Sequence, residues 1–176
     1  MKKIILPSIL LMVLFINSAY KNKRSSLHPL PVIKTDTIQF PGKTHFANVL
    51  QLTFGGDNTE AYFSFDGRYL IFQKKNLKEG IACDQIWMGK IPTATGEKFE
   101  PKLVSTGTGR TTCAYFFPDG KHILYASTHL ANKDCPPIPD RSKYGNKYIW
   151  AVYEGFDIFK ADTSGKIIQR LTTTNG

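Results

Sequence analysis

The sequence is poor in the signals that mark catalytic and metal-binding proteins. It contains no Gly-x-Ser-x-Gly nucleophile motif, no His-Glu-x-x-His zinc motif and no glycine-rich phosphate loop. Its three cysteines and four histidines form no Cys-x-x-Cys or His-x-x-x-His pair, which are common spacings of metal ligands. We therefore predict no catalytic residue, no metal site and no cofactor.

Acidic residues are few, since 14 stand against 23 Lys and Arg for a formal charge of +9. A basic exported protein could bind anionic lipid or an acidic polymer. Here, however, the basic residues are scattered, and no basic stripe with interleaved aromatic residues is present. The distribution favours an ordinary solvated surface, and we predict that nucleic acid is not a partner.

Long apolar runs are also missing. The apolar run of residues 4–16 spans 13 positions, whereas a transmembrane helix needs about 20. Two lysines precede it and small residues ending at Ala19 follow it, which predicts a secretory signal peptide over residues 1–19. We expect a periplasmic or secreted protein without stable membrane insertion after cleavage. An uncleaved anchor is the alternative, because basic residues follow within positions 21–24. A lipid anchor is not expected, because there is no cysteine near the cleavage site.

Residues 20–45 are largely polar and contain three prolines, which predicts an extended leader. After the leader, one sequence pattern occurs twice. Residues 61–72 read AYFSFDGRYLIF and residues 114–125 read AYFFPDGKHILY, an offset of 53 residues without a gap. A period of about 50 residues is typical of propellers and other repeat arrays.

Each copy of this pattern predicts a β-hairpin. An Asp-Gly pair stands between two runs rich in aromatic and β-branched residues, and Gly accepts the positive φ that a tight turn needs. Two further strands follow each hairpin, at 84–88 and 102–105 in the first repeat and at 156–160 and 168–172 in the second. The sequence therefore predicts an all-β protein built from four-stranded antiparallel units.

The repeat resembles the blades of TolB-type β-propellers. The residues that carry this likeness are a Leu-Thr pair at 52–53, the turns SFDGR (64–68) and FPDGK (117–121), and the third-strand motifs DQIW (84–87) and DIF (157–159). The resemblance covers roughly residues 47–176 and implies a partial propeller. Its first blade is 53–104 and its second is 105–171, and 172–176 begins a third.

The same resemblance implies that residues 46–52 form a strand that closes the ring. It also implies that the chain is the N-terminal piece of a longer protein, since two blades cannot close a ring. A two-bladed protein that closes by oligomerising is the alternative.

Two functions fit such a chain. One is an exported, non-enzymatic scaffold that binds a protein, a peptide or an envelope component. The other is the propeller domain of a larger prolyl-oligopeptidase-like serine hydrolase, whose catalytic domain would follow this segment.

One segment departs from the repeat. Residues 128–154 separate the second and third strands of the second unit, where the first unit has a far shorter loop. Long loops in compact domains are often functional, so this insertion is predicted to form either a ligand-binding lip or a structural flap. The candidate binding residues on this rim are Arg110, His129, Asp134, Arg141, Tyr144 and Trp150.

The cysteines are expected on that same rim. In an up-and-down blade, the loop after the second strand and the connection to the next blade open on one face. Cys83, Cys113 and Cys135 all fall in or beside such segments. In an exported protein this predicts a disulfide, which we assign to Cys113 and Cys135 with Cys83 as the competing partner. A metal site with His129 and a set of free thiols are the alternatives.

Overall fold

The computed structural model describes residues 41–42, 44–46, 49–94, 96–145, 147, 149 and 151–173. The predicted signal peptide, nearly all of the predicted leader, Trp150 and residues 174–176 lie outside the described residues. Within the described part of the chain, no helix is long and apolar enough to cross a membrane.

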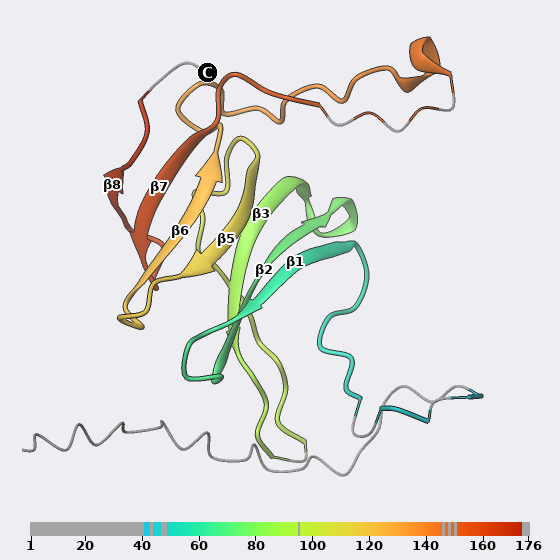
Figure 1. Ribbon diagram of the computed structural model, residues 1–176, viewed down its shortest axis with the longest axis vertical. Helices are drawn as coiled ribbons and strands as arrows, with labels where there is room; N and C mark the ends of the chain where they lie inside the picture. Colours follow the sequence, from blue (N-terminus) through green and yellow to red (C-terminus); the bar gives the residue numbers. More distant parts are fainter. Residues whose placement is uncertain are drawn as a thin grey trace, which may run out of the picture.

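The described chain is all-β and forms two four-stranded antiparallel sheets (Figure 1). The first sheet has the order β1 (Asp57–Phe63), β2 (Tyr69–Asn76), β3 (Ile81–Lys90), β4 (Lys102–Leu103). The second has the order β5 (Thr111–Phe116), β6 (His122–Ser127), β7 (Asp157–Asp162), β8 (Ile167–Arg170). Two short 3₁₀ helices, η1 (Leu77–Glu79) and η2 (Arg141–Tyr144), lie in connections. The predicted all-β class and the two four-stranded antiparallel units are confirmed.

The two Asp-Gly pairs form equivalent hairpin turns, as predicted. Asp66 accepts a hydrogen bond from the backbone N–H of Arg68 at 3.0 Å, and Asp119 accepts one from that of Lys121 at 2.8 Å. The following glycines have φ values of +70° at Gly67 and +66° at Gly120. Each turn is therefore fixed by an aspartate that bonds its own backbone and a glycine in the left-handed region.

Alanine at either turn glycine should lower the free energy of unfolding by about 1–2 kcal/mol, because an L-residue is strained in the left-handed region. A Cβ at Gly67 or at Gly120 would meet no atom within 4 Å, so the backbone strain acts alone. Urea unfolding of G67A and G120A checks this. Equal effects are expected from the two variants, and losses that differ by more than about 1 kcal/mol would contradict the equivalence of the turns.

The repeat extends to a detail that the sequence did not predict. β1 and β5 each carry a register irregularity before the turn, between Thr59 and Tyr62 and between Thr112 and Tyr115. Glu60 (φ +50°) and Cys113 (φ +52°) are the non-glycine residues with positive φ among the described residues. They stand at the same 53-residue offset as the turns. The bulge is therefore a repeated element of the fold.

The core lies between the sheets, where β5 packs against β1, β2 and β3. The first sheet contributes Ile71, Ile86 and Val104, all of which are buried. The second contributes apolar side chains from three neighbouring strands: Ala114, Phe116, Ile123, Tyr125, Phe159 and Ala161. Because successive side chains on a strand point to opposite faces, these residues mark the face of the second sheet that meets the first.

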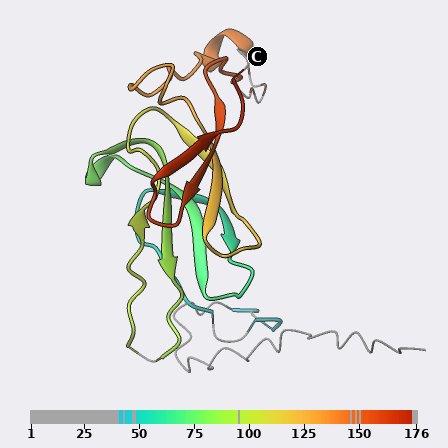
Figure 2. The ribbon, with the colours of Figure 1, turned by 90° about the vertical axis from the view of Figure 1, so that its left-hand side faces the viewer.

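The connections sort to opposite ends of the strands. Both views place the insertion 128–154 (orange) beyond one end, and the β3–β4 connection at the other (Figures 1 and 2). Segment 46–52 was predicted as a strand, but its described residues, 46 and 49–52, form none.

Candidate functional site

A buried polar network shapes the connection between the sheets, residues 104–110. The side chain of Gln85, which is 4% exposed, donates to the carbonyl of Gly109 at 2.8 Å. Its oxygen accepts from Ser105 Oγ at 2.7 Å and from the backbone N–H of Gly107 at 3.1 Å. One side chain of β3 thus satisfies the backbone of the connection, which holds Arg110 at a defined place beside β3.

The insertion 128–154, hereafter the flap, is attached to this connection. The backbone N–H of Gly109 donates to the carbonyl of Lys133 at 2.7 Å, and that of Arg110 donates to Thr128 Oγ1 at 2.9 Å. In Figure 1 the flap starts above β6 and extends over the end of the first sheet. It therefore crosses from its own sheet to the neighbouring one.

A disulfide joins the flap to the first sheet. The bond links Cys83 at the start of β3 to Cys135 in the flap, with Cα atoms 5.5 Å apart. The assignment to Cys113 and Cys135 was wrong, and the competing partner is the right one. The hydrogen bond between Gly109 and Lys133 holds this part of the flap at the connection, and Cys135 reaches Cys83 at the start of β3. Cys113 is free and exposed.

Arg110 is held from three directions at this end of the sheets. Its Nε lies 3.3 Å from Oδ2 of Asp84, and the side chain is only 15% exposed. Its Nη1 donates to the hydroxyl of Tyr153 at 3.2 Å, and the guanidinium carbon lies 5.4 Å from the centre of that ring. Its Nη2 lies 3.7 Å from Sγ of Cys135. The guanidinium therefore ties together β3, the connection and the flap.

A cavity of about 310 Å³, the flap pocket, opens beside Arg110. Its walls come from both sheets and from the flap. The residues around it are Gln73, Asp84, Arg110, Thr112, Cys113, Ile138, Pro139, Arg141, Ile149, Ala151, Tyr153 and Phe156. A hydrogen bond of 2.6 Å from Thr112 Oγ1 to Gln73 Oε1 links the two sheets at its base.

The structure brings only some of the predicted rim residues together. Arg110 and Arg141 line the flap pocket, and Cys113 lines it too, so this thiol lies at the predicted end of the sheets. Asp134 and Tyr144 are exposed elsewhere on the flap. His129 packs its ring 4.5 Å from that of Phe159, so it serves the core of the second sheet. Trp150 lies outside the described residues.

The sequence missed three residues of this site. Asp84 pairs with Arg110, Tyr153 supports the guanidinium, and Gln73 reaches the pocket from β2. Asp84 was part of the third-strand motif, and its neighbour Cys83 was already placed on the rim. That adjacency was the signal for Asp84, and the signal for Tyr153 was its place in the insertion 128–154. Nothing in the pattern of β2 marked Gln73.

His129 makes stability depend on pH. Burial lowers the pKa of His129 below 6.5; Asp157 opposes this and Arg170 adds to it. The unfolded state then binds more protons below about pH 6.5, so the free energy of unfolding should fall as the pH drops through that range. His129→Phe keeps the ring contact and removes the titration. Urea unfolding at about pH 5 and pH 8 should show a smaller difference for the variant, and an unchanged difference would contradict this assignment.

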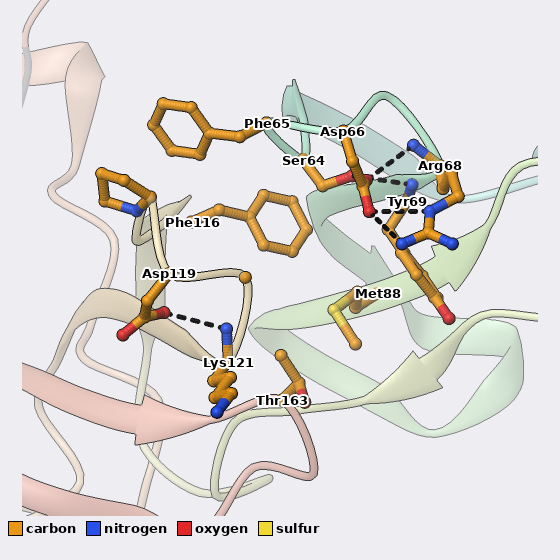
Figure 3. A pocket seen from close by; sticks show the side chains of 12 residues that line it. Ser64, Phe65, Asp66, Arg68, Tyr69, Met88, Phe116, Asp119, Lys121 and Thr163 are labelled. Atoms are coloured by element: carbon orange, nitrogen blue, oxygen red, sulfur yellow. Dashed lines mark hydrogen bonds and ion pairs between the residues drawn. The ribbon is translucent and has the colours of Figure 1, made fainter. Parts of the chain in front are cut away.

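A second cavity, of about 560 Å³, lies at the opposite end between the two Asp-Gly turns (Figure 3). Phe65, Phe116 and Met88 face it, and both turn aspartates lie on its rim. Hydrogen bonds from Ser64 and the Arg68 backbone lower the pKa of Asp66 to about 2. His122 and the Lys121 backbone do the same for Asp119. The charged form of each carboxylate is thus stabilised by hydrogen bonds within its own turn.

No protein-family model matches the chain, and no curated protein matches it significantly. Among the described residues, no group of three or more His, Cys, Asp or Glu side chains is placed to hold a metal ion.

Proposed function

We propose that the two sheets are consecutive blades of a TolB-like β-propeller and that the protein is an exported, non-enzymatic binding scaffold of the cell envelope. Its binding site is the flap pocket, and its ligand is a segment of a peptide or protein. The propeller interpretation is supported by the repeat of bulge and turn at an offset of 53 residues and by the same four-stranded antiparallel order in both sheets.

The observation that carries the binding function is the bridged flap. The disulfide fastens a 27-residue departure from the repeat across two adjacent units, and a pocket forms beneath it. A rigid scaffold that carries an ordered loop over a cavity is a common arrangement for ligand recognition. The disulfide also supports export, because such bonds persist in oxidising compartments.

A peptide library displayed on phage, selected against the disulfide-bonded protein, tests this function. Enriched peptides should bind with measurable heat in calorimetry, and binding should weaken at least about tenfold in Ile149→Asp, which alters the pocket wall. Lys121→Ala, at the other end of the sheets, is the matched control and should bind normally. Equal loss in both variants, or loss only in Lys121→Ala, would place the binding elsewhere.

Two further readouts address the remaining parts of the proposal. N-terminal sequencing of protein recovered from the producing cell's envelope or medium should begin near Tyr20, whereas recovery with Met1 intact would contradict signal cleavage. Mass spectrometry of the bound peptides after long incubation should find them intact. Peptide cleavage by the full-length protein would favour the propeller domain of a serine hydrolase instead.

A further inference from the structure

The flap pocket has two chemically different walls. The flap side is mainly apolar and includes Ile138, Pro139 and Ile149. The side formed by the strands is polar, with Gln73 and Thr112 at the junction of the two sheets. A ligand that fits both walls has an apolar part and a polar or charged group next to it.

The charges of the lining select the sign of that group. Three charged side chains border the pocket, the carboxylate of Asp84 and the guanidinium groups of Arg110 and Arg141. Asp84 pairs with Arg110, and the lining contains two guanidinium groups and one carboxylate. A negative ligand group is favoured over a neutral or positive one.

The contacts of Arg110 indicate which negative group the flap pocket would bind. Its ion pair with Asp84 and its contacts with Tyr153 and Cys135 involve Nε, Nη1 and Nη2 once each. A guanidinium has five N–H bonds, so one N–H on each terminal nitrogen has no partner among the described residues. Two N–H groups on the terminal nitrogens of a planar guanidinium can together bind both oxygens of a carboxylate. Because the side chain is already fixed, little rotamer entropy is lost on binding.

We propose that the flap pocket binds a carboxylate of a peptide, with Arg110 as its bidentate ligand and Arg141 as a second positive charge. The apolar wall of the flap holds the adjacent side chain. This inference rests on the proposed peptide-binding function and names the chemical group that the site recognises.

Cys113 provides a probe of the pocket in the intact protein, because it is exposed, free and part of the lining. Each labelling rate is divided by the rate of the same reagent with a free small thiol. On this scale an anionic methanethiosulfonate reagent, such as the sulfonatoethyl derivative, should modify Cys113 faster than the cationic trimethylammonium derivative. The ratio of the two normalised rates cancels the thiolate fraction and the intrinsic reactivities, so it reports the local potential. It should fall at least about threefold in Arg141→Gln, since a nearby unit charge is lost. Lys143→Gln, on the same 3₁₀ helix but outside the pocket, should leave the ratio unchanged.

Protection of Cys113 by short peptides then tests ligand recognition. Three probes of one apolar core sequence are compared: a free C-terminal acid, the C-terminal amide, and the amide with an internal Glu. The acid should slow labelling, with an affinity at least about tenfold above that of the amide. Protection by the internal Glu peptide as well would assign the site to any peptide carboxylate, and protection by the acid alone would assign it to C-termini.

Variants of Arg110 decide its role. Arg110→Lys keeps the charge and loses the planar fork, so acid binding should weaken while the labelling ratio stays near that of the wild type. Retention of the Cys83–Cys135 disulfide and of the melting temperature shows that the variant is folded. If it is not folded, Arg141→Gln supplies the test, since it should weaken acid binding severalfold.

Equal protection by acid and amide would overturn the carboxylate proposal while leaving peptide binding intact. Protection by none of the probes, or a normalised labelling ratio that favours the cationic reagent, would overturn it too. Failure of peptide binding in general is registered separately by the library selection, so the two proposals can fail independently.

Discussion

Removal of the disulfide, as C83A/C135A, is expected to lower the free energy of unfolding by about 3–4 kcal/mol. The bond closes a loop of 52 residues, and a loop of this length restricts the unfolded chain by about 4 kcal/mol. Because it also holds the flap against β3, its loss should free the flap and expose the pocket. Urea unfolding with and without reductant measures the stability, and limited proteolysis within 128–154 measures the release of the flap.

C113S is the matched control for this experiment. Cys113 is exposed and unbridged, so its replacement should change stability by less than about 0.5 kcal/mol and leave the flap resistant to protease. Non-reducing peptide mapping of the wild type should recover the peptides of Cys83 and Cys135 joined. A joined pair that contains Cys113, or a C113S variant as unstable as the double variant, would contradict the observed pairing.

Truncation of Phe159 to alanine is expected to cost about 3–5 kcal/mol, a large part of the stability of an ordinary domain. Phe159 is 1% exposed at the centre of the second sheet. Its ring lies 6.1 Å from that of Tyr125 and 4.5 Å from that of His129. Phe159→Leu, which fills more of the space, should cost about 1–1.5 kcal/mol. Denaturant unfolding of both variants measures the difference, and an alanine variant no worse than the leucine variant would contradict this account.

Removal of the hydroxyl of the neighbouring Tyr125, in contrast, is not expected to lower stability. Its side chain is fully buried, burial raises its pKa to about 12, and its hydroxyl has no hydrogen-bond partner among the described residues. Tyr125→Phe removes a buried polar group that folding leaves unpaired, so the free energy of unfolding should stay equal or rise by about 1 kcal/mol. The same unfolding series tests it, and a loss above 1 kcal/mol would indicate a partner for the hydroxyl.

The repeated sequence pattern predicted much of the fold, because its signals are local. Asp-Gly between apolar runs determines a turn within a few residues, and the alternating buried positions of β6 follow from the pleat of a strand. The bounds of the strands predicted after each hairpin differ from the observed ones by at most three residues. The bulges at Glu60 and Cys113 escaped prediction, because neither residue type signals a positive φ.

The sequence by itself determined the strand order, the two equivalent turns and the end of the sheets at which the cysteines lie. Those properties follow from residue periodicity and from the alternation of connections along antiparallel strands. Only the tertiary structure decided which cysteines pair and where Arg110 points. These depend on the path of the flap, which hydrogen bonds to Gly109 and Arg110 direct across the first sheet. Partners brought together by a long loop are set by its packing in space, and their spacing in the chain does not specify them.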